Sequence, residues 1–252
     1  MSFLRIENLS KSFGRWRTVN DVNLEIRQGE IVSVIGPNGA GKTTLFNLIS
    51  GRLKPDSGKV FFQGENVTGL PPHKIAKKSI SRSFQISNIF ANLTVYQNIR
   101  VPILAMRSKS PIFFRPLSSF GAENREALEV VEKLELKEQK DIVADLLSYG
   151  DRRKLEFGMA IAMKPKLLLL DEPTAGMNQI ETEKTVSLLR KMATEFGLTL
   201  ILTEHDMNVV FALADRILVM HQGSMLCEGP PEKIREDATV RSIYLGEEDW
   251  LY

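Results

Sequence analysis

Cysteine, tryptophan and histidine are scarce in this chain of 252 residues, which has one, two and three of them. Cys227 is the single cysteine, so no disulfide can form within the chain, and the disulfide-rich class of small secreted domains is excluded. We expect Cys227 to be a small apolar residue, buried or half-buried. No apolar run approaches the roughly 20 residues that a membrane-spanning helix needs. If the protein serves a membrane, a partner must therefore cross it.

An excess of charge of either sign is also lacking. Lysine and arginine together number 33, against 31 aspartates and glutamates, which gives a net charge of +2. A nucleic-acid-binding domain is usually strongly basic, so we expect no nucleic-acid partner. No signal peptide is recognisable at the start, where Met1 to Leu9 alternates like a strand. With one cysteine, this favours a reducing compartment such as the cytoplasm.

The hydrophobic pattern predicts an α/β fold. Strand signals dominate the first part, for example in Thr18 to Ile26, and the pattern turns helical from Leu93 to about Ala162. Strands and helices then alternate, which is typical of a parallel sheet with crossover helices. We expect one domain over 1–252. In it, 1–92 and 163–252 form a core with a mostly parallel sheet and an N-terminal antiparallel β subdomain, and 93–162 form an inserted helical subdomain.

A phosphate-binding loop is the strongest single motif. The pattern G-x-x-x-x-G-K-[ST] is matched in full by Gly36, Pro37, Asn38, Gly39, Ala40, Gly41, Lys42 and Thr43. The motif follows an apolar strand, Ile31 to Ile35, and precedes an apolar helix that starts at Thr44. Consecutive backbone N–H groups and the helix N-terminus would hold one phosphate group. Lys42 would reach the β- and γ-phosphates, and Thr43 would offer a hydroxyl to Mg²⁺.

A pair of acids supplies the second half of such a site. Four leucines, Leu167 to Leu170, are followed directly by Asp171 and Glu172. A buried strand that ends in an acid places the acid at the carboxyl edge of the sheet, where ligands bind. We expect Asp171 to hold Mg²⁺, directly or through water, and Glu172 to accept a proton from an attacking water.

Between these motifs, Leu147 is followed by Ser148, Tyr149, Gly150 and Asp151. Together with the loop and the acid pair, this segment resembles the Leu-Ser-Gly-Gly-Gln signature of the ATP-binding cassette (ABC) ATPases. The order of motifs matches that family along nearly the whole chain. Tyr149 and Asp151 depart from the usual signature, whereas Ser148 and Gly150, the expected phosphate contacts, are kept.

The resemblance assigns further residues. Phe13 resembles the aromatic residue that stacks on adenine, although Trp16 is a rival, since stacking on a base tolerates either ring. Gln85 resembles the glutamine that contacts Mg²⁺ and senses the membrane partner, and His205 resembles the switch histidine that contacts the γ-phosphate. The loop that crosses the dimer interface would comprise Ala175, Gly176, Met177 and Asn178. Asn178 departs from the usual aspartate.

The family also implies partners and a location. Two subunits, in a homodimer or a heterodimer with a related ATPase, pack head to tail with each ATP between the phosphate loop of one and the signature of the other. Transmembrane permease subunits and a solute-binding protein outside the cytoplasm would complete an importer. The chain would then be peripheral, at the cytoplasmic face of the membrane, with ATP and Mg²⁺ as its ligands.

The sequence around the motifs indicates which group of the ABC ATPases the chain resembles most. The run Leu155 to Ala160 and the insertion at 107–120 resemble the ATP-binding subunits of branched-chain amino-acid, urea or amide importers. The ending Ile243 to Glu247 is similar to that group, and also to the lipopolysaccharide-export ATPase.

A soluble ABC ATPase of DNA repair or ribosomes is an alternative, although no sustained heptads and no second phosphate loop are present. A regulatory module that binds ATP without hydrolysis would conflict with Glu172 and His205. The basis for substrate choice is not visible in this sequence.

Overall fold

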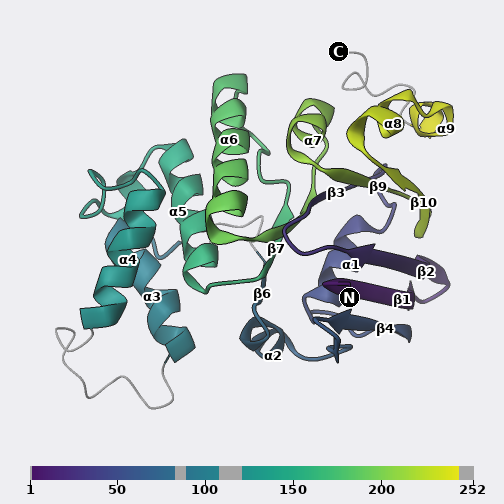
Figure 1. The fold of residues 1–252 in the computed structure, drawn as a ribbon, viewed down its shortest axis with the longest axis horizontal. Coiled ribbons are helices and arrows are strands. Elements are labelled where there is room, and N and C mark those ends of the chain that lie inside the picture. The colour runs from purple at the N-terminus through teal and green to yellow at the C-terminus, as the bar shows by residue number, and fades with distance from the viewer. Residues whose placement is uncertain (1, 83–88, 108–120, 244–252) are drawn as a thin grey trace. The chain divides into compact units, whose positions relative to one another are not determined.

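The computed structural model describes residues 2–82, 89–107 and 121–243. The chain divides into two compact units, each of which is described by itself (Figure 1). The sheet unit comprises residues 1–82 and 166–252, and the helical unit comprises residues 83–165. Within the described stretches, no helix is both long and apolar enough to cross a membrane.

The sheet unit contains two β-sheets. An antiparallel sheet has the order β2-β1-β4-β5, and a six-stranded sheet has the order β10-β9-β3-β8-β7-β6. The six-stranded sheet is parallel from β6 to β9, and β10 pairs antiparallel with β9. The strands are β1 (Leu4–Phe13), β2 (Trp16–Ile26), β3 (Ile31–Ile35), β4 (Ser57–Phe62), β5 (Glu65–Asn66), β6 (Ile80–Arg82), β7 (Leu167–Asp171), β8 (Thr199–Thr203), β9 (Arg216–His221) and β10 (Ser224–Gly229).

Burial explains why two kinds of sheet form. Every residue of β3, β7 and β8 is buried, as expected for central parallel strands covered on both faces. In contrast, β2 buries alternate residues over its second half, which is the pattern of a strand with one solvated face. One apolar core joins both sheets and includes Phe46 of helix α1 (Lys42–Ile49), whose side chain is fully buried.

Helices cover the other face of the six-stranded sheet (Figure 1). A second core joins β3 and β9 to three of these helices through residues such as Val219, Val210 and Ile234. The helices on this side are α6 (Gln179–Phe196), α7 (Met207–Leu213), α8 (Pro231–Glu236) and α9 (Ala238–Ile243), and α2 (Pro72–Lys77) precedes β6. The sheet with helices on both sides is the architecture that the alternating pattern predicts.

The helical unit is built from α3 (Val95–Arg107), α4 (Gly121–Lys133) and α5 (Tyr149–Ala162), with a short 3₁₀ turn at Ala144–Leu146. Helix α4 buries Ala127, Val130 and Val131 at helical spacing, and Leu134 just beyond its end is also buried. Leu128, by contrast, is exposed. Because Leu128 lies one residue after Ala127, it points about 100° away from it around the helix. The α/β class with an antiparallel subdomain and an inserted helical subdomain is confirmed.

The boundaries of the helical unit differ from those expected at 93 and 162. Residues before 93 bond to this unit, as where Asp145 N donates to Ala91 O (3.2 Å). The buried Asn98 side chain adds a bond from Phe90 N (2.8 Å). Such bonds between distant backbone groups leave no trace in hydrophobic periodicity, so the start at 83 was not predictable from the pattern.

Gly158 gives a test of the packing inside the helical unit. A Cβ atom at this buried position would lie 2.2 Å from Leu134 Cδ1 and 2.6 Å from Ile99 Cδ1, both in buried side chains. Overpacking of a core costs about 1–3 kcal/mol, which exceeds the roughly 1 kcal/mol that alanine gains over glycine inside a helix. We therefore predict that Gly158→Ala lowers the free energy of unfolding in urea.

Gly150→Ala is the matched control, because nothing lies within 4 Å of a Cβ at Gly150, near the start of the same helix. This variant should be as stable as wild type or more stable. Equal stability of the two variants would contradict the packing described for α5.

Candidate functional site

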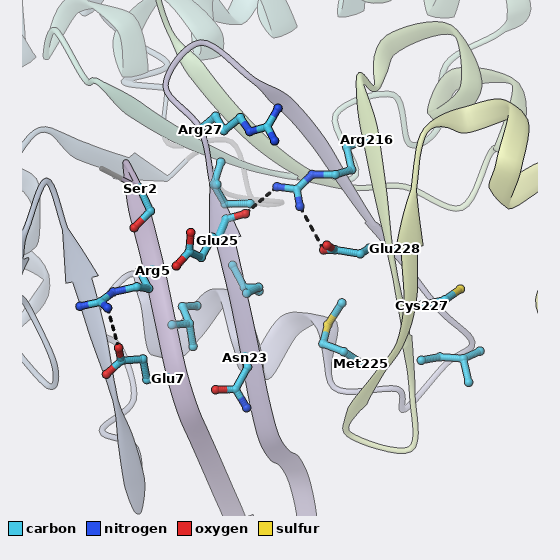
Figure 2. Close-up of a pocket in the computed structure, with 14 residues that line it drawn as sticks. Ser2, Arg5, Glu7, Asn23, Glu25, Arg27, Arg216, Met225, Cys227 and Glu228 are labelled. Atoms are coloured by element: carbon cyan, nitrogen blue, oxygen red, sulfur yellow. Dashed lines mark hydrogen bonds and ion pairs between the residues drawn. The ribbon is translucent and has the colours of Figure 1, made fainter.

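One surface hollow on the described part of the sheet unit is large but holds none of the predicted motifs. This groove, of about 990 Å³, runs between β2 and β10 (Figure 2). Two of its arginines form ion pairs: Arg216 binds Glu228 (3.0 Å) in the groove and Glu30 (2.8 Å) beyond its lining, and Arg5 binds Glu7 (2.9 Å). The guanidinium groups of Arg5 and Arg216 are thus already partnered, and the groove has no features of a phosphate site.

The smaller cavity, of about 170 Å³, brings the predicted motifs together. It is lined by Thr18, Asn38, Gly39, Ala40, Gly41, Lys42, Thr43, Thr44, Glu172 and His205. The cavity thus brings together residues of the phosphate loop, one of the two acids and the histidine. Gly36 and Pro37 belong to the loop but do not line the cavity.

The loop between β3 and α1 needs glycine at fixed points. Gly41 has φ of 102°, a region that favours glycine, and a Cβ there would lie 2.3 Å from Thr18 O. At Gly36, a Cβ would lie 2.2 Å from Met220 O. The loop is further tied to the β9–β10 turn by a bond from Gly223 N to Ala40 O (3.1 Å). Among the described residues, no side chain caps the N-terminus of α1.

Lys42 provides the positive charge of the cavity. Its residue surface is only 8% exposed, and its ammonium donates to Gly36 O and to Pro37 O (3.3 Å). A buried ammonium is costly unless it has strong partners, and a phosphate oxygen is a stronger acceptor than a neutral carbonyl. A phosphate group would fit here, beside the buried Lys42 ammonium, the glycine-rich loop and the helix N-terminus.

Glu172 and His205 lie side by side in the lining of the cavity. His205 Nε2 lies 3.1 Å from Glu172 Oε1, and both side chains are partly exposed. Glu172 follows β7 with φ of 44°, the left-handed region that side-chain-bearing residues seldom adopt. Its N–H donates to Thr203 O (2.9 Å), the last residue of the neighbouring strand β8. The unusual φ turns Glu172 away from the direction of Asp171, as two adjacent acids with separate roles require.

Asp171 does not line the cavity. Its Oδ1 accepts from Thr203 Oγ1 (3.1 Å), and its Oδ2 accepts from Arg82 Nε (3.1 Å) and forms an ion pair with Arg82 Nη2. Both side chains of the pair are buried, at 7% and 8% exposure. Arg82 also donates to Asn47 Oδ1 (2.7 Å) on α1. Removing one partner of a buried pair typically costs about 3–5 kcal/mol, so Arg82 fixes Asp171 firmly.

Of the three predicted Mg²⁺ ligands, one lines the cavity. Thr43 lines the cavity, Asp171 lies behind it, and Gln85 lies outside the described residues. In the described part of the chain, no group of three or more acidic, histidine or cysteine side chains could hold a metal by itself. Mg²⁺ usually keeps waters and uses one or two carboxylates with substrate phosphates, so this donor set fits a metal that arrives with a nucleotide.

Glu204 was missed by the sequence analysis. Its side chain is 4% exposed, and its Oε1 accepts from Thr174 N (2.8 Å) and Thr174 Oγ1 (2.7 Å). Burial raises the pKa of Glu204 above its usual 4.5, the bonds from Thr174 and His205 N lower it, and the charge of Glu172 adds to the rise. Its position directly before His205 was the only signal in the sequence.

The other aromatic and loop residues have local roles. Phe13 and Trp16 face each other across the β1–β2 turn, are 48% and 81% exposed, and neither lines the cavity. Asn178 is the N-cap of α6: its Oδ1 accepts from Glu181 N (3.0 Å), and its own N–H donates to Glu181 Oε2 (3.1 Å). Asparagine thus serves the helix start well at the position where the family usually has aspartate.

The signature segment lies in the helical unit, at the N-terminus of α5. Ser148 is the N-cap of this helix and accepts from Asp151 N (3.1 Å), and its hydroxyl donates to Asp151 Oδ2 (2.9 Å). Asp151, which departs from the family glutamine, therefore holds the Ser148 side chain. Tyr149 is exposed, with the Arg153 guanidinium carbon 5.7 Å from its ring centre. A Cβ atom at Gly150 would meet nothing within 4 Å.

Comparison with known families covers most of the chain. Residues 19–175 match the family described as ABC transporter, and residues 224–249 match the one described as branched-chain amino acid ATP-binding cassette transporter. The chain is 39% identical to the high-affinity branched-chain amino acid transport ATP-binding protein BraF of Pseudomonas aeruginosa, over 97% of this chain and 98% of BraF. It is 35% identical to the lipopolysaccharide export system ATP-binding protein LptB of Haemophilus influenzae, over 98% and 99%.

Solved structures agree with these matches. The ADP conformation of MJ1267, an ATP-binding cassette of an ABC transporter, has a TM-score of 0.88 at 29% identity, over 98% of this chain and all of that one. A dimeric post-hydrolysis state of the cassette MJ0796, bound to ADP and Pi, has a TM-score of 0.75 at 28% identity, over 90% and 98%.

The buried Glu204 carboxyl predicts a pH dependence of stability. Its pKa is raised in the folded state, so the folded chain binds this proton more tightly than the unfolded chain does. This contribution is fully present below the usual 4.5 and is lost as the pH rises through the raised pKa. Glu204→Gln does not titrate, so wild type should lose stability relative to this variant over that window. Urea unfolding from about pH 4 to about pH 8 measures the difference, and a constant difference would contradict the buried carboxyl.

Proposed function

This chain belongs to the ABC transporter family and is an ATPase, and we propose that it drives import of branched-chain amino acids or related small polar solutes. The observation that carries the proposal is the single cavity lined by Lys42, Thr43, Glu172 and His205. The match of residues 224–249 to the branched-chain amino acid group favours this branch over lipopolysaccharide export. The higher identity to BraF than to LptB supports the same choice.

The phosphate loop would bind the triphosphate. The residues proposed for this are Gly36, Pro37, Asn38, Gly39, Ala40, Gly41, Lys42, Thr43 and Thr44. Lys42 would exchange its two loop carbonyls for the β- and γ-phosphate oxygens, which are stronger acceptors. Phe13 would stack on adenine, with Trp16 beside it on the same turn.

Thr43, Asp171 and Gln85 would hold Mg²⁺ together with the phosphates. The metal, when bound, would neutralise charge that develops on the phosphate oxygens. Asp171 keeps acceptor capacity for this, because each carboxylate oxygen offers two lone-pair positions and Thr203 uses one of those on Oδ1.

Glu172 would act as the general base and His205 as a contact for the γ-phosphate. The separation of 3.1 Å between them places both within reach of one small group in the cavity. The Glu172 carboxylate would accept the proton of the attacking water, while His205 Nε2 would donate to a γ-phosphate oxygen. His205 would thereby leave Glu172 when nucleotide binds.

A second subunit would complete the site. We propose that Ser148 and Gly150 of one subunit, at a helix N-terminus, contact the γ-phosphate held by the other. Ala175, Gly176, Met177 and Asn178 would cross the same interface, and Tyr149 and Asp151 would flank the contact. A related cassette dimer bound to ADP and Pi supports this arrangement.

The remaining partners follow from the importer assignment. Transmembrane permease subunits would carry the solute, and a solute-binding protein would deliver it. The cassette would sit at the cytoplasmic face of the membrane as a homodimer or with a related subunit. The name of the relative BraF supports a transport role, and the near-neutral charge of +2 is in keeping with a chain that binds no nucleic acid.

Replacement of the proposed base gives the sharpest test. Glu172→Gln keeps the size of the side chain but removes the basic carboxylate, so hydrolysis should fall by about 10²–10⁴-fold. Loss of one negative charge near the triphosphate should also favour the closed dimer. We predict an ATP-dependent dimer of this variant in size-exclusion chromatography with light scattering. Hydrolysis at the wild-type rate would remove Glu172 from the role of base.

Ser148→Arg added to Glu172→Gln is the control for the interface. A bulky cation at Ser148 should prevent the dimer but leave ATP binding to the monomer intact, since Ser148 would act on the opposite subunit's nucleotide. A double variant that still dimerises with ATP would contradict the head-to-tail arrangement.

A further inference from the structure

The loop between β7 and α6 links the site to the proposed dimer interface. It starts at Glu172, whose φ of 44° is strained for a residue with a side chain, and it ends at Asn178, the cap of α6. A left-handed residue costs of order 1 kcal/mol or more, so surrounding bonds must hold it. The strained position is the one that directs the Glu172 carboxylate to His205.

Three backbone bonds hold the loop. Glu172 N donates to Thr203 O (2.9 Å), Ala175 N to Glu172 O (3.2 Å), and Met177 N to Thr174 O (3.1 Å). The last two lie within the loop and close its turns, but they do not attach its middle to the sheet. Thr174 attaches the middle of the loop, because its N–H and its hydroxyl both donate to Glu204 Oε1.

Glu204 also holds the segment that carries the histidine. Its second oxygen, Oε2, accepts from His205 N (3.3 Å). One carboxylate therefore binds the loop after Glu172 on one side and the backbone of His205 on the other. The groups around it are Thr174, buried like Glu204, and the charged or titratable Glu172 and His205.

A buried carboxylate at this point lowers stability. Burial and the nearby negative charge of Glu172 both disfavour its ionised form, and only its hydrogen bonds oppose them. A residue that costs stability inside the core, next to two functional side chains, indicates a role in positioning. Three donors converge on it, a number that a hydroxyl side chain could not accept as well.

We propose that Glu204 is a positioning residue for hydrolysis: by binding Thr174 and His205 N at once, it fixes the contact between Glu172 and His205 and joins that contact to the interface loop. This rests on the proposed role of Glu172. Glu204 touches no reacting atom itself, and its effect passes through the placement of its neighbours. Movement of Ala175 to Asn178 on subunit contact would reach His205 through Thr174 and Glu204.

The experiment compares kcat and KM for ATP with nucleotide affinity in six variants of the full chain. Glu204→Gln removes an acceptor for His205 N, and Thr174→Val removes the hydroxyl donor at nearly constant volume. Each should lower kcat roughly 10- to 100-fold, the effect of misplaced catalytic groups, with KM and ATP affinity changed less than about twofold. Thr174→Ser keeps the hydroxyl and should restore kcat to near the wild-type value.

Thr199→Val is the matched structural control. Thr199 is fully buried at the other end of β8, where its hydroxyl accepts from Gly29 N (2.9 Å). This variant should lose stability while kcat stays near wild type. The double variant Thr174→Val with Glu204→Gln should be little slower than either single variant, because both act on one network.

Two results would overturn the inference. One is a wild-type kcat in both Glu204→Gln and Thr174→Val. The other is a loss of kcat in Thr199→Val as large as theirs, which would make the effect one of stability. Glu172→Gln in the same assay separates the two proposals. If it is inactive while Glu204→Gln is fully active, only the positioning role fails, and if it keeps the wild-type rate, both fail.

Discussion

The parallel pairing of β3, β8 and β7 is the constraint on which the site depends. These strands are neighbours in the sheet and run in one direction, so their carboxyl ends meet at one edge. The phosphate loop follows β3, Glu172 follows β7, and His205 lies just after β8. Residues that are more than 160 positions apart in the chain line one cavity for this reason.

The second feature of the site is that its acids have unlike surroundings. Asp171 is the last residue of a buried strand and is bound by Arg82 and Thr203. Glu172, which has a left-handed φ, directs its carboxylate to His205 instead. This division is what separate roles in metal binding and in proton transfer need. Glu204 adds a third, buried carboxyl that attaches the loop after Glu172 to the segment after β8.

Sequence reasoning succeeded where the chemistry is local. The phosphate loop and the four leucines before Asp171 are contiguous, so their strand, turn and helix could be predicted residue by residue. It failed for Arg82 and Glu204, because their partners are 89 and 30 positions away and are set by strand pairing. The capping of α6 by Asn178 was also missed, because it depends on where that helix begins.

The most direct test of the central claim is a calorimetric titration of ATP into wild type, Lys42→Ala and Lys166→Ala. The Lys42 ammonium is buried beside the loop carbonyls, whereas that of Lys166 bonds to Gln63 at an exposed position outside the cavity. A charge-assisted bond contributes about 1.5–3 kcal/mol, so Lys42→Ala should bind ATP roughly 10- to 100-fold more weakly or not measurably. Lys166→Ala should bind like wild type. Unchanged affinity in Lys42→Ala would contradict the assignment of this cavity to ATP.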